Sequence, residues 1–106
     1  METINDLSQL NTRIKSTETP LLIKFTADWC GPCKAIQPGL ESLGRELGYE
    51  IVAVDVDKDT TNSASSFSVS SLPTILICNQ GREVGRFSGS RPQDQIRALV
   101  IGALNG

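Results

Sequence analysis

The chain has 106 residues, of which 39% are apolar and 21% charged, values typical of one ordinary globular domain. Ten Lys and Arg against twelve Asp and Glu give a formal charge of −2 with no block of like charge, which argues against binding to nucleic acid or to an anionic membrane. Histidine is absent, which excludes histidine-dependent catalysis and histidine-ligated metals within the chain, and three cysteines are too few for a four-cysteine zinc site.

The first part of the chain predicts a helix followed by a buried strand. Leu7, Leu10 and Ile14 recur at helical spacing. Residues 21–26, Leu-Leu-Ile-Lys-Phe-Thr, are a short apolar run of the kind that lies buried on both faces of a parallel or mixed sheet. The only charge in this run, Lys24, lies in its middle.

The middle of the chain predicts a long helix and a second buried strand. Residues 51–57, Ile-Val-Ala-Val-Asp-Val-Asp, form that strand, with polar residues at its C-terminal end. The helix runs from Pro32 to about Tyr49, and Pro38 inside it should introduce a kink. Its apolar positions at helical spacing are Ile36, Leu40, Leu43 and Leu47.

The last part predicts a hairpin and a closing helix. Residues 74–78 and 83–88 read as antiparallel strands on either side of the turn sequence Asn79-Gln80-Gly81. Ser90 with Gln93 resembles a capping box at the start of the final helix. The apolar stripe of that helix comprises Ile96, Leu99, Val100, Ala103 and Leu104.

One Ser- and Thr-rich segment, residues 60–71, separates the second strand from the hairpin. Such residues compete for backbone hydrogen bonds, so we expect a loop or a short, frayed helix that Phe67 and Val69 anchor to the core. The order of the elements predicts an α/β fold with a mixed sheet, in one domain that spans residues 1–106.

The sequence Trp29-Cys30-Gly31-Pro32-Cys33 lies where the first buried strand gives way to the long helix. At a helix N-terminus, free N–H groups and the helix dipole stabilise a thiolate and lower its pKa. Two intervening residues let the second thiol reach the first sulfur after one helical turn, so Cys30 can attack a disulfide and Cys33 can resolve the mixed disulfide. Trp29 offers a flat apolar surface to a substrate. A metal site would need further ligands that the chain does not offer.

Two other features have ordinary structural interpretations. Cys78 lies inside an apolar strand without a partner, and we expect it in the core. Asp55, Asp57 and Asp59 resemble the start of a calcium loop, but the glycine at the sixth loop position and the acid at the twelfth are missing. We therefore expect these acids at a strand end in solvent.

Together these residues resemble the thioredoxin family over nearly the whole chain. The motif Trp29-Cys30-Gly31-Pro32-Cys33-Lys34 is similar, residue for residue, to the active site of that family. Further matches follow in the family's order, at Pro38, Asp55-Val56-Asp57, Leu72-Pro73-Thr74, Gly81 and Gly89. The resemblance implies a thioredoxin fold, with a central mixed β-sheet of four to five strands flanked by about four helices.

The resemblance also implies a role for each residue of the site. Cys30 would be the exposed nucleophile and Cys33 the resolving thiol, joined as a redox disulfide when oxidised. Pro73 would follow a cis bond and face the cysteines, and substrate would pair with the backbone of Leu72 in strand-like fashion. The substrate groove would comprise Trp29, Gly31, Pro32, Ser71, Leu72, Pro73, Ser88 and Gly89.

The implied activity is the reduction of disulfide-containing proteins, with electrons from a thioredoxin reductase and ultimately NADPH, and with no bound cofactor or metal. The N-terminus Met1-Glu2-Thr3-Ile4-Asn5-Asp6 lacks the pattern of a signal peptide, and no apolar run is long enough to span a membrane. We therefore expect a cytoplasmic monomer in electron transport and cell redox homeostasis, without nucleic-acid or membrane contact. A docking module that uses the same groove without turnover, and an oxidase or isomerase, are the alternative functions.

Lys24 departs from the family, which usually carries a buried aspartate six residues before the first cysteine, thought to relay the proton of the resolving thiol. The family's frequent lysine on the adjacent strand matches Ala53 here, and Thr26 replaces an aromatic residue. Three interpretations are open. Lys24 can extend to the strand end or pair with an acid such as Asp55. Desolvation can keep it neutral as a base for Cys33. A cationic Lys24 can stabilise thiolate and make the protein a weaker reductant.

Overall fold

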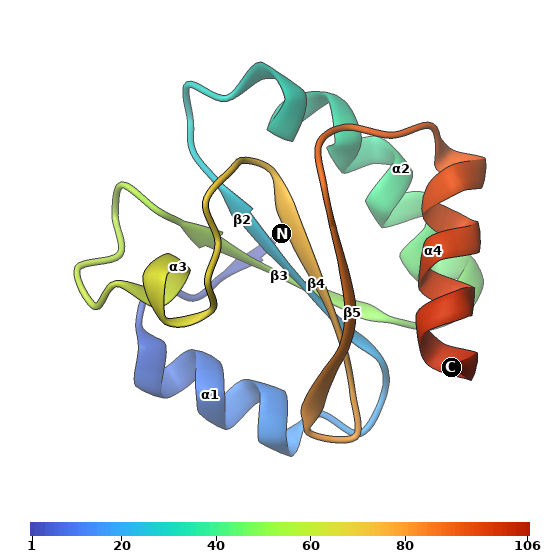
Figure 1. Cartoon of the computed structure of the whole chain (residues 1–106), viewed down its shortest axis with the longest axis horizontal. Helices are drawn as coiled ribbons and strands as arrows, with labels where there is room; N and C mark the ends of the chain where they lie inside the picture. Colours follow the sequence, from blue (N-terminus) through green and yellow to red (C-terminus); the bar gives the residue numbers. More distant parts are fainter.

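The structure, a computed structural model of residues 1–106, has a five-stranded mixed sheet with helices packed on both faces (Figure 1). Along the sheet the strand order is β1-β3-β2-β4-β5; β1, β3 and β2 are parallel, and β4 is antiparallel to both of its neighbours. The elements in chain order are β1 (Glu2–Thr3), α1 (Leu7–Ser16), β2 (Leu21–Thr26), α2 (Gly31–Leu47), β3 (Glu50–Asp55), α3 (Ser63–Ser66), β4 (Thr74–Asn79), β5 (Arg82–Ser88) and α4 (Gln93–Asn105).

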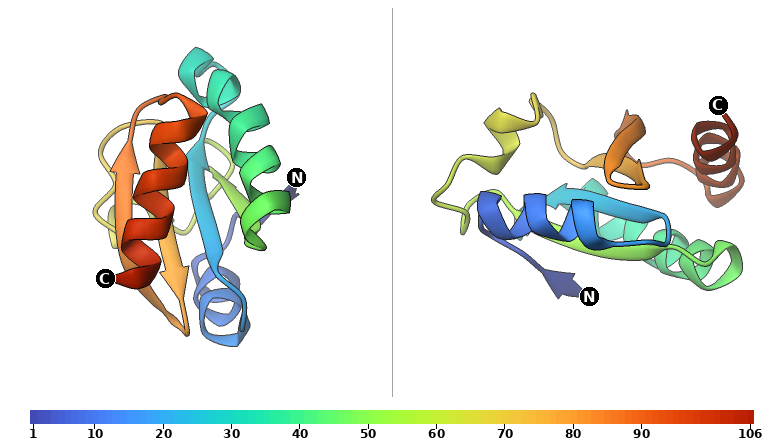
Figure 2. Two further views of the ribbon diagram at one scale, coloured as in Figure 1. Left: turned by 90° about the vertical axis from the view of Figure 1, so that its right-hand side faces the viewer. Right: turned by 90° about the horizontal axis from the view of Figure 1, so that it is seen from below.

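The central strand β2 supplies side chains to two separate cores. Leu22 joins the core under α2 and α4, while Ile23 and Phe25 join the core under α1 and α3. Figure 2 shows α2 and α4 lying together on one side of the sheet. Because side chains alternate along a strand, Lys24 projects to the same side as Leu22, toward α2. The apolar run therefore predicted the strand correctly, and its one charge is buried with it.

Helix α2 begins at the cysteine pair and ends two residues earlier than predicted. Cys30 is its N-cap, and the helix continues through Pro38 without a break. At its other end Gly48 adopts a left-handed conformation with φ 75°, which glycine tolerates without steric cost and which stops the helix at Leu47. Tyr49 then folds back, and its hydroxyl donates to the Leu40 carbonyl.

Two boundaries and one additional strand differ from the predictions. The third strand ends at Asp55, where the chain turns and the Lys58 N–H donates to the Asp55 carbonyl. Helix α4 has Pro92 as its N-cap and no side-chain cap, so the predicted capping box at Ser90 and Gln93 is wrong. The physical reason is that a residue before proline avoids the helical region, so the helix starts only after Pro92. The two-residue strand β1 is too short for a periodic pattern to predict.

The Ser- and Thr-rich segment forms the four-residue helix α3, as predicted for a short, frayed element. The Asp59 carboxylate accepts the backbone N–H groups of Ser63 (2.9 Å) and Thr61 (2.8 Å) and also the Thr61 hydroxyl. Burial would raise the pKa of Asp59, but these hydrogen bonds outweigh it and lower the pKa to about 2. Phe67 packs against Phe25, with ring centroids 6.1 Å apart.

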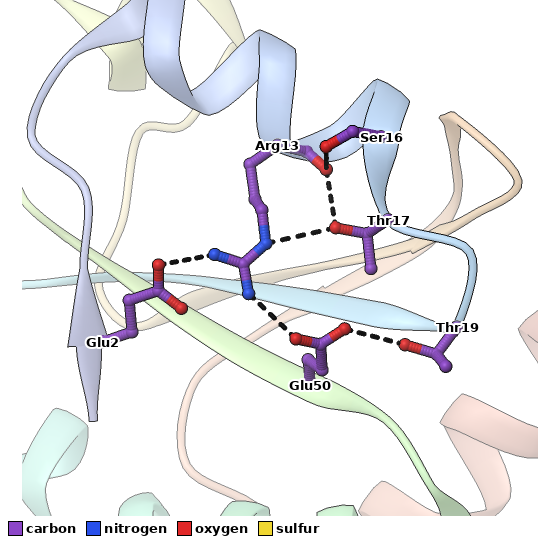
Figure 3. A network of polar contacts seen from close by, with 6 residues as sticks. All are labelled: Glu2, Arg13, Ser16, Thr17, Thr19 and Glu50. Carbon is purple, nitrogen blue, oxygen red and sulfur yellow. Dashed lines mark hydrogen bonds and ion pairs between the residues drawn. The ribbon is translucent and has the colours of Figure 1, made fainter.

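A cluster of charges ties the first elements to the sheet (Figure 3). Arg13 of α1 donates to Glu2 of β1 at 2.5 Å and to Glu50 of β3 at 2.9 Å. Thr17 ends α1 by donating its hydroxyl and its N–H to the Arg13 carbonyl. One guanidinium thus joins three elements. Elsewhere, none of the helices combines the length and the apolar character needed to cross a membrane.

Candidate active site

Cys30 and Cys33 form a disulfide at the start of α2. The Cys30 sulfur accepts the backbone N–H of Cys33 at 3.2 Å, so the cysteine itself caps the helix. Gly31 and Pro32 occupy the first turn and are exposed, and Pro32 lacks an N–H at a position where the helix needs none. The remaining N–H groups of the turn and the helix dipole favour a thiolate at Cys30 once the disulfide is reduced.

Both cysteines are buried, which corrects the prediction of an exposed nucleophile. Cys30 is 4% exposed and Cys33 is fully buried. They pack with Ala27, and Val56 and Leu72 cover the same cluster. In the disulfide form the Cys30 sulfur is bonded to that of Cys33, which lies wholly inside the protein, and this holds the nucleophile inward.

Trp29, next to the disulfide, is the most exposed of the large apolar side chains, at 71%. Its indole Nε1 donates to Asp57 Oδ2 at 2.7 Å, and Asp55 Oδ1 accepts the Asp57 N–H at 3.0 Å. The sequence assigned Asp57 only to a strand end, because the contact to Trp29 joins residues 28 positions apart. One feature of the sequence could have indicated this contact. The carboxyl ends of parallel strands lie at the same edge of a sheet, and Asp57 follows the strand that pairs with β2.

The loop before β4 lies against the disulfide. The Leu72–Pro73 bond is cis, and Leu72 packs on the cysteine cluster while Pro73 is buried. The Gly89 N–H donates to the Pro73 carbonyl at 2.9 Å, which joins the end of β5 to this loop. Gly89 has φ 84°, a value that favours glycine. The structure therefore brings these predicted groove residues together beside the cysteines.

The backbone of Leu72 is free within this loop. Its N–H and C=O have no hydrogen-bond partner in the chain, whereas the neighbouring Ser71 and Pro73 carbonyls each accept a hydrogen bond. The Thr74 hydroxyl donates to the Ser71 carbonyl at 2.7 Å and lies 2.9 Å from the Ser88 hydroxyl, so the flanking groove residues are fixed. Unpaired backbone groups in an ordered loop can pair with an extended peptide.

The site is an open face. The protein surface has three hollows, and none of them is lined by a cysteine, by Trp29 or by Leu72. Small molecules are usually enclosed by a pocket, whereas an open face suits a segment of another protein.

Lys24 lies in the middle of β2 and is 3% exposed. Its Nζ donates to Gln37 Oε1 of α2 at 2.7 Å, and no carboxylate lies within ion-pair distance of it. The predicted pairing with Asp55 is therefore wrong, because Asp55 faces Lys58 at 3.7 Å. Burial lowers the pKa of Lys24, and the negative charge of Glu41 opposes this only in part.

A recess of about 450 Å³ opens beside Lys24. Residues that line it belong to β2, to the segment before the cysteines, to the first turn of α2 and to the end of β3 and the turn after it. Among the lining residues are Lys24, Ala27, Asp28, Lys34, Asp55 and Lys58. A polar recess of this size is large enough to hold water.

The remaining candidate residues serve the structure. Cys78 is 2% exposed and unpaired, as predicted for a core residue, and burial raises the pKa of its thiol to about 11. The carboxylates of the three aspartates contact different partners: Asp55 contacts Lys58, Asp57 contacts Trp29, and Asp59 accepts the Ser63 N–H. No three acids or cysteines come together as a metal-binding group.

Comparison with known proteins points to one family. The family model described as Thioredoxin matches residues 3–101. The chain is 36% identical over 99 residues to mitochondrial thioredoxin of Mus musculus, which covers 92% of this chain and 59% of that protein. It is 39% identical over 88 residues to thioredoxin of Bacillus subtilis (strain 168), covering 81% and 84%. The solved structure of Fasciola hepatica thioredoxin is similar with a TM-score of 0.85 and 31% identity, covering 97% of this chain and 99% of that one.

The comparisons contradict the cytoplasmic location expected from the sequence. Similar proteins are mitochondrial in Mus musculus and chloroplastic in Oryza sativa subsp. japonica, and the Bacillus subtilis relative is bacterial. The chain spans 59% of the length of the mitochondrial relative. Proteins similar to this chain are therefore found in several compartments.

Proposed function

The chain belongs to the thioredoxin family, and on that premise we propose that it reduces the disulfide bonds of other proteins by dithiol–disulfide exchange. The observation that carries the proposal is the disulfide of Cys30 and Cys33 at the N-cap of α2. Two adjacent thiols supply both electrons of the reaction, so the exchange needs no bound cofactor.

The reaction consists of two exchanges. In the first, the Cys30 thiolate attacks a substrate disulfide; a bond forms between Cys30 and one substrate sulfur, and the other leaves as a thiolate and takes a proton from water. In the second, deprotonated Cys33 attacks the Cys30 sulfur, and the second substrate sulfur leaves as a thiolate. Two electrons pass to the substrate, and the protein ends with the Cys30–Cys33 disulfide.

Lys24 takes the proton of Cys33 in the second exchange. Cys33 and Gln37 lie four residues apart on α2 and so on adjacent turns of one helix face, and Lys24 hydrogen-bonds to Gln37. A lysine whose pKa is lowered by burial can lose its proton and act as a base. The recess beside it lets the proton pass on to water.

Substrate lies along the open face between Trp29 and the loop before β4. Trp29, fixed by its bond to Asp57, provides an apolar contact, and the free N–H and C=O of Leu72 pair with the substrate backbone. The other groove residues in this proposal are Gly31, Pro32, Ser71, Pro73, Ser88 and Gly89.

The oxidised protein must be reduced again before the next cycle. We propose a thioredoxin reductase as the partner that does so, with NADPH as the ultimate source of electrons. Disulfide-containing proteins are the other partners, and the protein acts as a monomer.

Trapping the intermediate tests the proposal directly. Replacing Cys33→Ser removes the resolving thiol, so incubation with insulin should accumulate a mixed disulfide that peptide mapping by mass spectrometry assigns to Cys30. The Cys30→Ser protein is the matched control and should form none. A docking module would bind the partner equally well in both variants and form no covalent adduct, which would contradict the proposed reaction.

A further inference from the structure

A row of polar groups leads from Lys24 to the outer face of α2. Lys24 Nζ donates to Gln37 Oε1 at 2.7 Å, and Gln37 Nε2 donates to Glu41 Oε1 at 2.9 Å. Gln37 is half-buried and Glu41 is exposed. Cys33, Gln37 and Glu41 are spaced by four residues, so they occupy successive turns of the helix that carries the site.

The contacts of Gln37 fix the orientation of its amide. The Glu41 carboxylate can only accept a hydrogen bond, so the amide nitrogen must face it; the same nitrogen lies 3.1 Å from the Met1 sulfur, a second acceptor. The amide oxygen is left for Lys24. It can accept a hydrogen bond from an ammonium or from a neutral amine, but it cannot take the proton or supply a compensating charge.

The charges around Lys24 single out Glu41. Lys24 is flanked in the sheet by Ala53 and Ile75, which carry none. The other charged groups near it line the recess: the Met1 ammonium, Asp28, Lys34, Asp55 and Lys58. The two acids in that set both lie 3.7 Å from Lys58, which offsets them. Glu41 is the one carboxylate linked to Lys24 by hydrogen bonds through a single side chain.

We propose that Glu41, acting through Gln37, sets the pH at which Lys24 releases its proton and hence the pH at which Cys33 is deprotonated. Glu41 and Gln37 are positioning residues, since neither reaches the reacting sulfurs. The inference rests on the proposed function of Lys24. It assigns to this chain an electrostatic coupling in which an amide joins a buried lysine to a surface carboxylate.

The test is the pH dependence of protein-disulfide reduction by the full chain. Glu41→Gln removes a negative charge that favours the protonated lysine, so the alkaline rise of the rate should move to lower pH by about 0.5 to 1 unit. Glu18→Gln is the matched control, because Glu18 is an exposed acid without a hydrogen bond or ion pair, and it should leave the rise in place. Equal profiles for wild type and Glu41→Gln would overturn the inference.

A second variant separates the path through Lys24 from a direct effect of Glu41 on Cys33. Introducing Glu41→Gln into the Lys24→Met protein should then leave the alkaline rise of the rate in place, whereas the same shift in both backgrounds would contradict the inference.

The Lys24 ¹³Cε resonance of the reduced protein gives a readout independent of activity, because the chain has only four lysines and Lys24→Met identifies the signal. Its titration should move to lower pH in Glu41→Gln and stay unchanged in Glu18→Gln. If Lys24→Met itself leaves the rate profile unaltered, the proposed function of Lys24 fails, a result distinct from the loss of the Glu41 effect alone.

Discussion

Two cations of this protein, Arg13 and Lys24, are placed against the sheet in opposite electrostatic settings. Arg13 contacts two carboxylates, Glu2 and Glu50 (Figure 3), and these hydrogen bonds raise its pKa. Lys24 is more deeply buried and has only the uncharged amide of Gln37, and its pKa is lowered. A paired cation holds its proton and joins elements of the fold. A buried cation without a counter-charge is poised to lose its proton, which is the property that acid–base chemistry needs.

The largest expected effect comes from removing the unpaired cation. Lys24→Met should lower the rate of protein-disulfide reduction at pH 7 by about 10-fold or more, because Cys33 loses its proton acceptor. The free energy of unfolding should be retained, since methionine fits an apolar strand and removes a charge without a counter-charge. Rates and urea unfolding measure the two effects. Lys15→Met, at an exposed position on α1, is the control and should change neither.

Removing Arg13, the paired cation, should affect stability and not the rate of disulfide reduction. Arg13→Met should lower the free energy of unfolding by about 1 kcal/mol, because two partly exposed ion pairs are lost, and should leave the rate of disulfide reduction unchanged. The loss should shrink in 1 M NaCl, which screens such pairs. Arg82→Met is the control, at an exposed site without an ion pair. A drop in the rate at unchanged stability would refute the structural role of Arg13.

The smallest expected effect is in the pH dependence of stability. The pKa of Lys24 is lower in the folded protein than in the unfolded chain, so between the two values the unfolded chain binds more protons. Stability from Lys24 therefore increases as the pH rises from the folded pKa toward about 10.5, the unfolded value. The raised pKa values of Cys78 and Tyr49 make stability fall as the pH rises. This contribution is the same in wild type and in Lys24→Met. Relative to wild type, Lys24→Met should lack this increase; equal alkaline slopes in urea unfolding would contradict the lowered pKa.

Local patterns predicted the frame of the fold. The apolar runs at residues 21–26 and 74–78 became central strands because a strand buried on both faces leaves a continuous apolar signal. The capping box at Ser90 failed because Pro92 overrides it. Strand β1 was missed because two residues carry no period. The family resemblance implied the cis bond before Pro73, which no local pattern could supply, whereas the order of the strands was not predicted.

The site was predicted less completely, because its decisive contacts join distant residues. The cysteine pair was visible as a motif, but the burial of Cys30 follows from the disulfide and from packing around it. An ion pair of Lys24 with an acid such as Asp55 was one of the interpretations that the sequence left open. Gln37 reaches Lys24 instead from α2, 13 residues away. Asp57 likewise contacts Trp29 only through tertiary packing.

In the proposed reaction, Cys30 and Cys33 reduce protein disulfides and Lys24 governs the proton of Cys33. The most direct test is the rate of insulin reduction across pH, with dithiothreitol as electron source, for wild type, Cys30→Ser and Lys24→Met. The rate should exceed the dithiothreitol background and require Cys30, and its alkaline rise should change position in Lys24→Met. A wild-type rate equal to that of Cys30→Ser at every pH would contradict the claim of catalysis, and an unchanged rise in Lys24→Met would contradict the role of the lysine.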